Sequence, residues 1–151
     1  MTDGKFTHIV LYKANPGNPK AAGQIIAAAN RYLKPIAKET HTAFNAGRAS
    51  ENDRAVMGYD FDVGLSFIFD SRDAEKEYQK DPRHMKYVRF VLNGWMLKGS
   101  KSNDPQAEFI DYILHAKPGE NRKHVRNPKI PDSQVVWVDE KVYQFGDDQK
   151  K

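Results

Sequence analysis

The segment from Phe61 to Phe69 constrains the fold of this chain more than any other part of the sequence. Large apolar residues alternate along it with small or polar ones, which is the pattern of a β-strand that packs one face against a core. The other face carries Gly64 and Ser66, whose small side chains allow a second backbone to come close. The apolar face consists of Phe61, Val63, Leu65, Phe67 and Phe69. Such a face requires a layer of helices to cover it.

The flanking segments show either strand or helical periodicity, in a definite order. Asp81 and Pro82 indicate where the second part of a split helical unit begins, because aspartate is a good helix cap and proline suits a first turn. In chain order we expect a strand over 6–13, a helix over 20–38, a weaker strand over 41–48, the strand described above, the split helical unit over 71–96 and a strand over 108–115. This β-α-β-β-α-β order is typical of a ferredoxin-like α+β fold, whose antiparallel sheet carries helices on one face.

The second face of the predicted sheet also needs a partner. In the first strand Thr7, Ile9 and Leu11 share this face, and the small residues Gly64 and Ser66 continue it in the third strand. The chain offers no second helical layer to cover it. A second copy of the same chain is the simplest cover, and we therefore expect a homodimer formed through this face.

We expect a core domain over residues 5–115 and a C-terminal appendage over residues 116–151. Residues 116–134 are rich in Pro, Asn, Lys and Arg and are typical of a long loop. The segment from Val135 to Phe145 is again strand-like and carries too much apolar surface for a free tail. This C-terminal strand extension is therefore predicted to add to the sheet or to lie on the partner subunit.

Composition excludes several classes of protein. The chain of 151 residues has no cysteine, which excludes disulfides, thiolate metal sites and cysteine nucleophiles. Its net charge of +4 is mild, and no aromatic residue interleaves the basic residues of the 117–129 loop, so we expect no nucleic-acid partner. We see neither a signal peptide nor an apolar run of the roughly 20 residues that a membrane span needs. The expected location is the cytoplasm, with no membrane partner.

Three motifs in the expected order resemble the stress-responsive A/B barrel domain family, Dabb. In this family the first strand opens with a histidine that is followed by apolar residues and a lysine. The third strand runs from an aromatic-acidic pair to Phe-acidic-Ser, and a Tyr-x-x-x-Pro-x-His signature comes after it. A further match is Gly47-Arg48, which resembles the end of the family's second strand. In this chain the three motifs are Phe6-Thr-His8-Ile-Val-Leu-Tyr-Lys13, Phe61-Asp62 to Phe69-Asp-Ser71, and Tyr78-Gln-Lys-Asp81-Pro82-Arg-His84. The resemblance covers about residues 5–115. It implies a dimeric α+β barrel with a pocket between sheet and helices in each subunit.

The resemblance also implies a candidate site. In olivetolic acid cyclase, a catalytic member of the family, residues matching His8, Tyr78 and His84 lie at the active site. A further pocket histidine of that enzyme corresponds here to Val63. Many members of the family have no assigned activity, so the resemblance alone leaves both a binding and a catalytic role open.

The chemistry of these three residues supports the same site independently. His8 shares the inward strand face with Val10. His84 falls in the first turn of a helix, where the helix dipole disfavours imidazolium and a neutral ring can act as a base. Tyr78 could donate a hydrogen bond to an oxyanion. Alternatively, the two histidines only satisfy each other or a backbone carbonyl at the edge of the core. The remaining expected ligand-binding residues are Val10, Tyr32, Val63, Leu65 and Phe67.

We expect neither a metal nor a cofactor, because the five histidines form no closely spaced pair and no nucleotide fingerprint is present. The leading functional hypothesis is the binding of a small apolar or aromatic molecule in the pocket, in a stress-related or metabolic role. One alternative is a cofactor-free cyclase, isomerase or lyase that acts on a carbonyl compound with His84 as base. Another is a structural dimer that serves protein partners. The sequence does not decide whether the protein is an enzyme.

Overall fold

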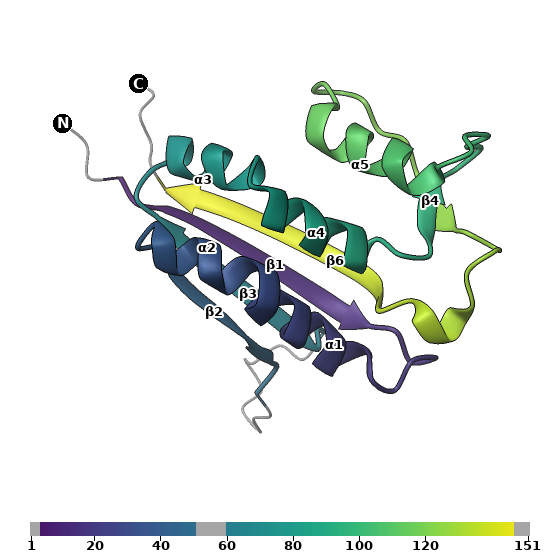
Figure 1. Cartoon of the computed structure of the whole chain (residues 1–151), viewed down its shortest axis with the longest axis horizontal. Coiled ribbons are helices and arrows are strands. Elements are labelled where there is room, and N and C mark those ends of the chain that lie inside the picture. Colours follow the sequence, from purple (N-terminus) through teal and green to yellow (C-terminus); the bar gives the residue numbers. More distant parts are fainter. Residues whose placement is uncertain (1–3, 51–59, 147–151) are drawn as a thin grey trace.

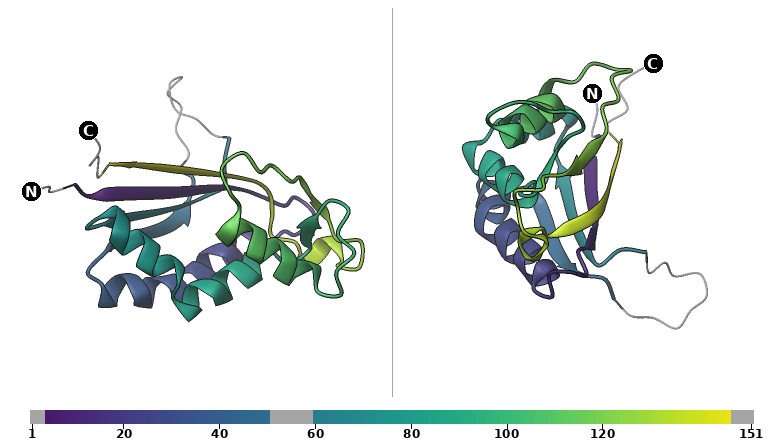
Figure 2. Two further views of the ribbon diagram at one scale, coloured as in Figure 1. Left: turned by 90° about the horizontal axis from the view of Figure 1, so that it is seen from above. Right: turned by 90° about the vertical axis from the view of Figure 1, so that its right-hand side faces the viewer.

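The computed structural model describes residues 4–50 and 60–146, which form a four-stranded sheet with helices packed on one of its faces and a separate two-stranded sheet, β4-β5 (Figure 1). The four-stranded sheet is antiparallel and has the strand order β2-β3-β1-β6. Its strands are β1 (Phe6–Ala14), β2 (Ala43–Arg48), β3 (Val63–Phe69) and β6 (Trp137–Gly146). The helices that cover it are α1 (Ala21–Ala28), α2 (Lys34–Glu39), α3 (Arg72–Gln79) and α4 (Pro82–Val91). Within the described residues, the opposite face of the sheet carries no helix, as both views in Figure 2 show.

Strand alternation places the core as the sequence predicts, except at Phe61, which precedes β3, is only partly buried and lies beside Gly64 on the uncovered face. In β1 every second residue from Phe6 to Tyr12 is buried toward the helices, and in β3 the same holds from Val63 to Phe69. The residues between them lie on the uncovered face and remain partly or fully exposed. The predicted ferredoxin-like α+β fold is therefore confirmed, with its helices on one face only.

The first helical segment continues past Pro35 instead of ending there. Because proline has no backbone N–H, it removes one hydrogen bond of a regular helix. Residues Ala29–Leu33 accommodate this loss in a π-helical turn between α1 and α2. The second helical unit is split as predicted: Ser71 accepts a hydrogen bond from the backbone N–H of Ala74 at 3.1 Å and caps α3, and Asp81 accepts from the N–H of Arg83 at 2.8 Å and caps α4.

The prediction of a strand over 108–115 is wrong. This segment belongs to helix α5 (Pro105–His115), which Asp104 caps by accepting a hydrogen bond from the N–H of Ala107 at 3.1 Å. Its apolar residues are mostly adjacent, so they fit a short strand and a helix equally well. The Asp-Pro pair at positions 104–105 is a helix-start signal of the same kind as the one before α4.

The fourth strand of the sheet is β6, which comes from the segment beyond residue 115. It pairs antiparallel with β1, from Phe6 opposite Gly146 to Ala14 opposite Trp137, with one irregularity near Ala14. The prediction that this segment adds a strand to the sheet is thus confirmed. Residues 92–136 form an insertion between α4 and β6 that carries β4 (Trp95–Leu97), α5, β5 (His124–Arg126) and the 3-10 turn η2 (Asp132–Gln134). We propose that residues 6–146 fold as one unit.

Two tryptophans join this insertion to the core. The rings of Trp95 in β4 and Trp137 in β6 stack with centroids 4.7 Å apart. The indole N–H of Trp95 donates to the carbonyl of Trp137 at 3.2 Å, and that of Trp137 donates to the carbonyl of Val91 at the end of α4 at 2.6 Å. Both indoles are buried, so each N–H finds the partner that burial requires. The stack fixes the start of β6 and the base of the insertion relative to α4.

Replacement of Trp137 with Ala tests this anchor. We expect a loss of about 3–5 kcal/mol in the free energy of unfolding, because a buried aromatic ring and its hydrogen bond are removed together. Urea unfolding measures the loss. Leu114→Ala, at a partly exposed position on α5, is the control and should cost less than about 1 kcal/mol. Equal losses for the two variants would show that the tryptophan stack does not anchor the insertion.

Candidate ligand-binding site

A cavity of about 930 Å³ lies between the sheet and the helices α3, α4 and α5. Its volume is in the range that small-molecule sites occupy in proteins. Strand register sets its sheet-side wall, because the inward residues of β1 face across to the inward residues of β6. These cross-strand pairs are His8 with Gln144, Val10 with Val142, and Tyr12 with Glu140, and all six residues line the cavity.

His8 contributes a neutral imidazole to the cavity wall. The side chain is 7% exposed, and its Nδ1 lies 2.7 Å from the amide nitrogen of Gln144. Since an amide nitrogen only donates, Nδ1 accepts and the ring proton sits on Nε2. Burial lowers the pKa of His8 from 6.5 to about 4, so the ring is uncharged near neutral pH.

His84 lies in the first turn of α4 and lines the same cavity. Its Nδ1 is buried and has no hydrogen-bond partner among the described residues. Burial lowers the pKa of His84 to about 4, with a further contribution from His8, while the backbone of Gln79 and the carboxylate of Asp81 oppose the shift. A buried nitrogen without a partner costs about 1–3 kcal/mol, which a ligand could recover by forming a hydrogen bond with it.

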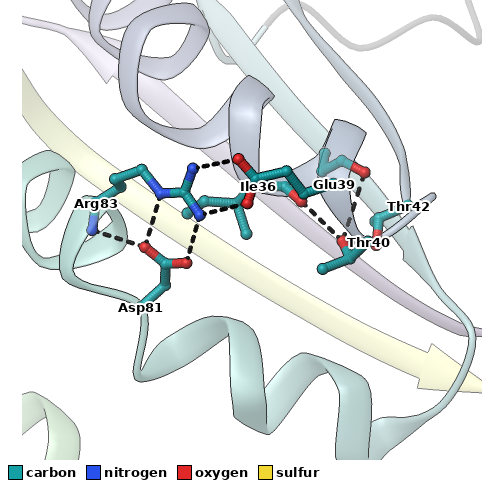
Figure 3. Close-up of polar contacts among 7 residues, drawn as sticks. Ile36, Glu39, Thr40, Thr42, Asp81 and Arg83 are labelled. Carbon is teal, nitrogen blue, oxygen red and sulfur yellow. Dashed lines mark hydrogen bonds and ion pairs between the residues drawn. The ribbon is translucent and has the colours of Figure 1, made fainter.

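Arg83 fixes the turn that carries His84. Its guanidinium donates two hydrogen bonds to the carboxylate of Glu39, at 2.8 and 2.9 Å, and two more to Asp81, at 2.9 and 3.0 Å (Figure 3). These charge-assisted hydrogen bonds tie the beginning of α4 to the end of α2 and hold the pKa values of Glu39 and Asp81 below their usual range. Because His84 follows Arg83 directly, the same contacts limit where its ring can lie.

Tyr78 packs beside His84 in the cavity wall. The two rings meet edge to face with centroids 4.7 Å apart, and Tyr78 also contacts Phe67 and Phe69 at 5.1 and 5.2 Å. Burial raises the pKa of Tyr78 well above its usual value of 10, so the phenol keeps its proton at neutral pH. The structure therefore brings together all three residues of the sequence-predicted site: His8, Tyr78 and His84.

The predicted apolar ligand contacts divide into two groups. Val10, Leu65 and Phe67 line the cavity, whereas Val63 and Tyr32 are not among the described residues that do. Val63 is fully buried on the helix-covered side of β3. Leu33, the neighbour of Tyr32 in the π-helical turn, lines the cavity. The ligand-binding role of all five residues stays a prediction.

Sequence reasoning missed the residues that β6 and α5 bring to the cavity. Glu140 and Gln144 escape notice because a strand's own sequence does not reveal which strand it pairs with. On α5, Ile113, Leu114 and His115 line the cavity from the insertion. On α4, helical periodicity does carry a signal: Met85, Val88 and Leu92 belong to the predicted inner stripe of this helix and line the cavity, and Tyr87, three residues after His84, lines it as well.

Glu140 is the most unusual of these additional residues. Burial raises the pKa of its carboxyl group from 4.5 to about 7, with Asp139 adding to the shift and a hydrogen bond from Tyr12 opposing it. Tyr12 in turn accepts a hydrogen bond of 2.9 Å from the hydroxyl of Tyr87.

In residues 4–50 and 60–146, no group of three or more His, Asp or Glu side chains is placed to hold a metal ion. No helix in the same residues has the length and hydropathy of a membrane span.

Comparison with protein families identifies the first two-thirds of the chain. Residues 6–97 match the family model described as Stress responsive A/B Barrel Domain. The match covers more than half of the chain and ends with β4, before α5 and β6. Among curated proteins, no sequence matches the chain.

Solved structures share the fold at low sequence identity. A dimeric ferredoxin-like protein of unknown function from Thermobifida fusca is 16% identical, with a TM-score of 0.50 over 96% of this chain and 92% of that chain. A second such protein, from Jannaschia sp., is 18% identical, with a TM-score of 0.48 over 67% and 91%. A Dabb family protein from Mesorhizobium loti is 20% identical, with a TM-score of 0.44 over 57% and 80%. At these identities the likeness concerns the fold alone.

The neutral histidines predict how stability depends on pH. A histidine whose pKa is about 4 when folded and 6.5 when unfolded stabilises the protein above pH 6.5, and this contribution is lost as the pH falls toward 4. Replacing His84 with Phe should therefore reduce the acid-induced loss in the free energy of unfolding between pH 6.5 and 4.5. The expected reduction is about 1.4 kcal/mol per pH unit, because one fewer proton is taken up on unfolding. Urea unfolding at a series of pH values measures this slope.

Glu140 provides a control whose effect on the pH dependence of stability has the opposite sign. A carboxyl group whose pKa is raised to about 7 stabilises the protein below its unfolded value of 4.5, and that contribution is lost as the pH rises toward 7. Glu140→Gln should therefore steepen the acid-induced loss over the same pH range. Identical slopes in the native protein and in His84→Phe would contradict the assignment of His84 as a buried, neutral side chain.

Proposed function

Because the chain belongs to the stress responsive A/B barrel domain family, we propose that it binds a small, mostly apolar or aromatic molecule in the cavity between its sheet and its helices. The observation that carries this proposal is that His84 lines the cavity and that its buried Nδ1 has no hydrogen-bond partner in the described part of the chain. Folded proteins pair nearly all buried polar atoms, so an unpaired one on a residue of a cavity wall marks a position where a ligand can bind. A stress-related or metabolic role in the cytoplasm is part of the proposal.

The character of the cavity wall supports a neutral ligand. Val10, Leu65 and Phe67 provide apolar surface, and the buried histidines and tyrosines are uncharged near neutral pH. The Nε2–H of His8 supplies a donor for a carbonyl oxygen, because its other nitrogen is occupied by Gln144. A few such polar groups in a mostly apolar pocket are typical of small-molecule sites.

A cofactor-free reaction on a carbonyl compound is the second candidate function. The contact between the rings of His84 and Tyr78 favours it, since an imidazole could remove a proton next to a carbonyl while a phenol donates to the resulting oxyanion. The low pKa of His84 makes it a weak base, however, and this favours binding over catalysis. The cavity and the unpaired nitrogen argue against the third hypothesis, a purely structural dimer.

We also propose that the protein is a homodimer built through the uncovered face of its sheet. Thr7, Ile9 and Leu11 lie on this face beside Gly64 and Ser66. Large apolar side chains extend the same surface to the sheet edges and are about half exposed in the single chain: Ile68, Tyr143 and Phe145. An apolar surface of this kind marks an interface. The Thermobifida fusca protein of the same fold is described as dimeric, which agrees with the proposal.

Binding of Prodan, a fluorescent and uncharged aromatic ketone, tests the ligand site. We expect a blue shift of its emission with the native protein and a several-fold weaker affinity with His84→Phe, which keeps a ring but removes the Nδ1–H that would donate to the ketone oxygen, an atom that can only accept. The melting temperature of His84→Phe should stay nearly unchanged, because Nδ1 has no protein partner to lose. Glu77→Leu, at an exposed position of α3 outside the cavity lining, is the control and should retain native affinity. A stability loss of about 1–3 kcal/mol in His84→Phe with unchanged Prodan binding would contradict the proposal.

Sedimentation tests the dimer. The native protein should sediment as a dimer at micromolar concentration, and Leu11→Glu should sediment as a monomer, because a buried and unpaired charge costs about 3–5 kcal/mol. Lys38→Glu, an exposed residue of α2 on the helical side, is the control and should remain dimeric. A native protein that sediments as a monomer would refute this assembly.

A further inference from the structure

The cavity has a second polar position, away from the histidines. Glu140 lies opposite Tyr12, four residues along β1 from His8, and both line the cavity. Four strand residues span about 13 Å. The pair between these positions is apolar, consisting of Val10 and Val142. The polar groups of the wall are therefore separated along the strands by an apolar stretch.

The hydrogen bonds around Glu140 leave it able to bind a further group. The Tyr87 hydroxyl donates to Tyr12, so the single proton of the Tyr12 hydroxyl is free for Glu140. Both phenols are buried, and burial raises both pKa values, which keeps them protonated. A carboxyl group offers about four acceptor positions, and Tyr12 fills one of them. Among the described residues, Asp139 is the one charged side chain that acts on Glu140, and it is itself acidic.

We propose that Glu140 binds a hydroxyl group of the ligand, so that the cavity takes an elongated, mostly apolar molecule with a carbonyl oxygen at its histidine end and a hydroxyl at its Glu140 end. This inference rests on the proposed ligand-binding function and makes the ligand class more specific. The donor at one end is the Nε2–H of His8, and the acceptor at the other is the carboxyl group. Apolar atoms must fill the space between, with the two polar atoms on the order of 10 Å apart.

The protonation of Glu140 suits a hydroxyl better than a charged group. With a pKa of about 7, the carboxyl group is divided between its two forms near neutral pH. The ionised form accepts a hydrogen bond from a hydroxyl, and the protonated form donates one, so a hydroxyl finds a partner in both. A ligand with an anionic group at this position would instead be repelled by the negative charge of ionised Glu140. Because β6 lies beyond residues 6–97, Glu140 is a feature of this chain outside the family match.

A matched pair of naphthyl ketones tests the inference. The compound 6-acetyl-2-naphthol carries a hydroxyl across the ring system from its carbonyl group, and 2-acetylnaphthalene lacks that hydroxyl. Equilibrium dialysis of the full chain, at a pH near 6.5 where the naphthol is neutral, gives both dissociation constants. We expect the native protein to bind the hydroxyl compound about tenfold more tightly, as one added hydrogen bond to a buried carboxyl group predicts. In Glu140→Leu the preference should disappear while the affinity for 2-acetylnaphthalene is retained.

The variants separate the possible failures. Glu77→Leu, at an exposed position of α3, is the control and should keep the native preference. If Glu140→Leu does not fold, Glu140→Gln replaces it and should reduce the preference to about threefold, because an amide forms a weaker hydrogen bond than a carboxylate. Equal binding of the two ketones by the native protein, or a preference that survives in Glu140→Leu, overturns the role of Glu140 and leaves the proposed function intact. Absence of binding for both ketones and for Prodan overturns the proposed function itself.

Discussion

The pairing of β1 with β6 is the constraint on which the cavity depends. These strands come from opposite ends of the chain and run side by side over nearly their whole length (Figure 1). Their antiparallel register places Gln144 opposite His8 and Glu140 opposite Tyr12. Without β6 the cavity would lose one wall and His8 would lose the hydrogen bond that determines its tautomer. The tryptophan stack at the start of β6 supports the same register, because the indole of Trp137 is hydrogen-bonded to the end of α4.

Burial leaves the histidines and tyrosines of this cavity polar but uncharged near neutral pH, whereas Glu75, Lys76 and Lys80 add charged side chains to its wall. Desolvation lowers the pKa of both histidines, raises that of the tyrosines and raises that of Glu140 toward neutrality. Hydrogen-bonding groups without full charges favour a neutral ligand with carbonyl or hydroxyl groups. A charged cluster nearby, formed by Arg83, Asp81 and Glu39, pairs its charges internally and positions His84 (Figure 3).

Local patterns predicted most of the fold, and nonlocal pairing explains what they did not predict. The alternation in β1 and β3 and the Asp81-Pro82 helix start are properties of short segments, so His8, Tyr78 and His84 could be placed together before the structure was known. In α5 the adjacent apolar residues matched a strand as well as a helix, and this error assigned the fourth strand to the wrong segment. Glu140 depended on that assignment.

The central claim is that the imidazole of His84 is neutral, buried and available to a ligand. Nitrogen NMR of the protein labelled with ¹⁵N-histidine tests it most directly, because the two ring nitrogens report protonation and hydrogen bonding separately. At about pH 7, well above the His84 pKa of about 4, we expect a neutral His84 ring with its proton on Nδ1, and an Nδ1 resonance that shifts when 2-acetylnaphthalene is added. A ring that is protonated at that pH, or a His84 resonance that stays unchanged while the ketone binds, would contradict it.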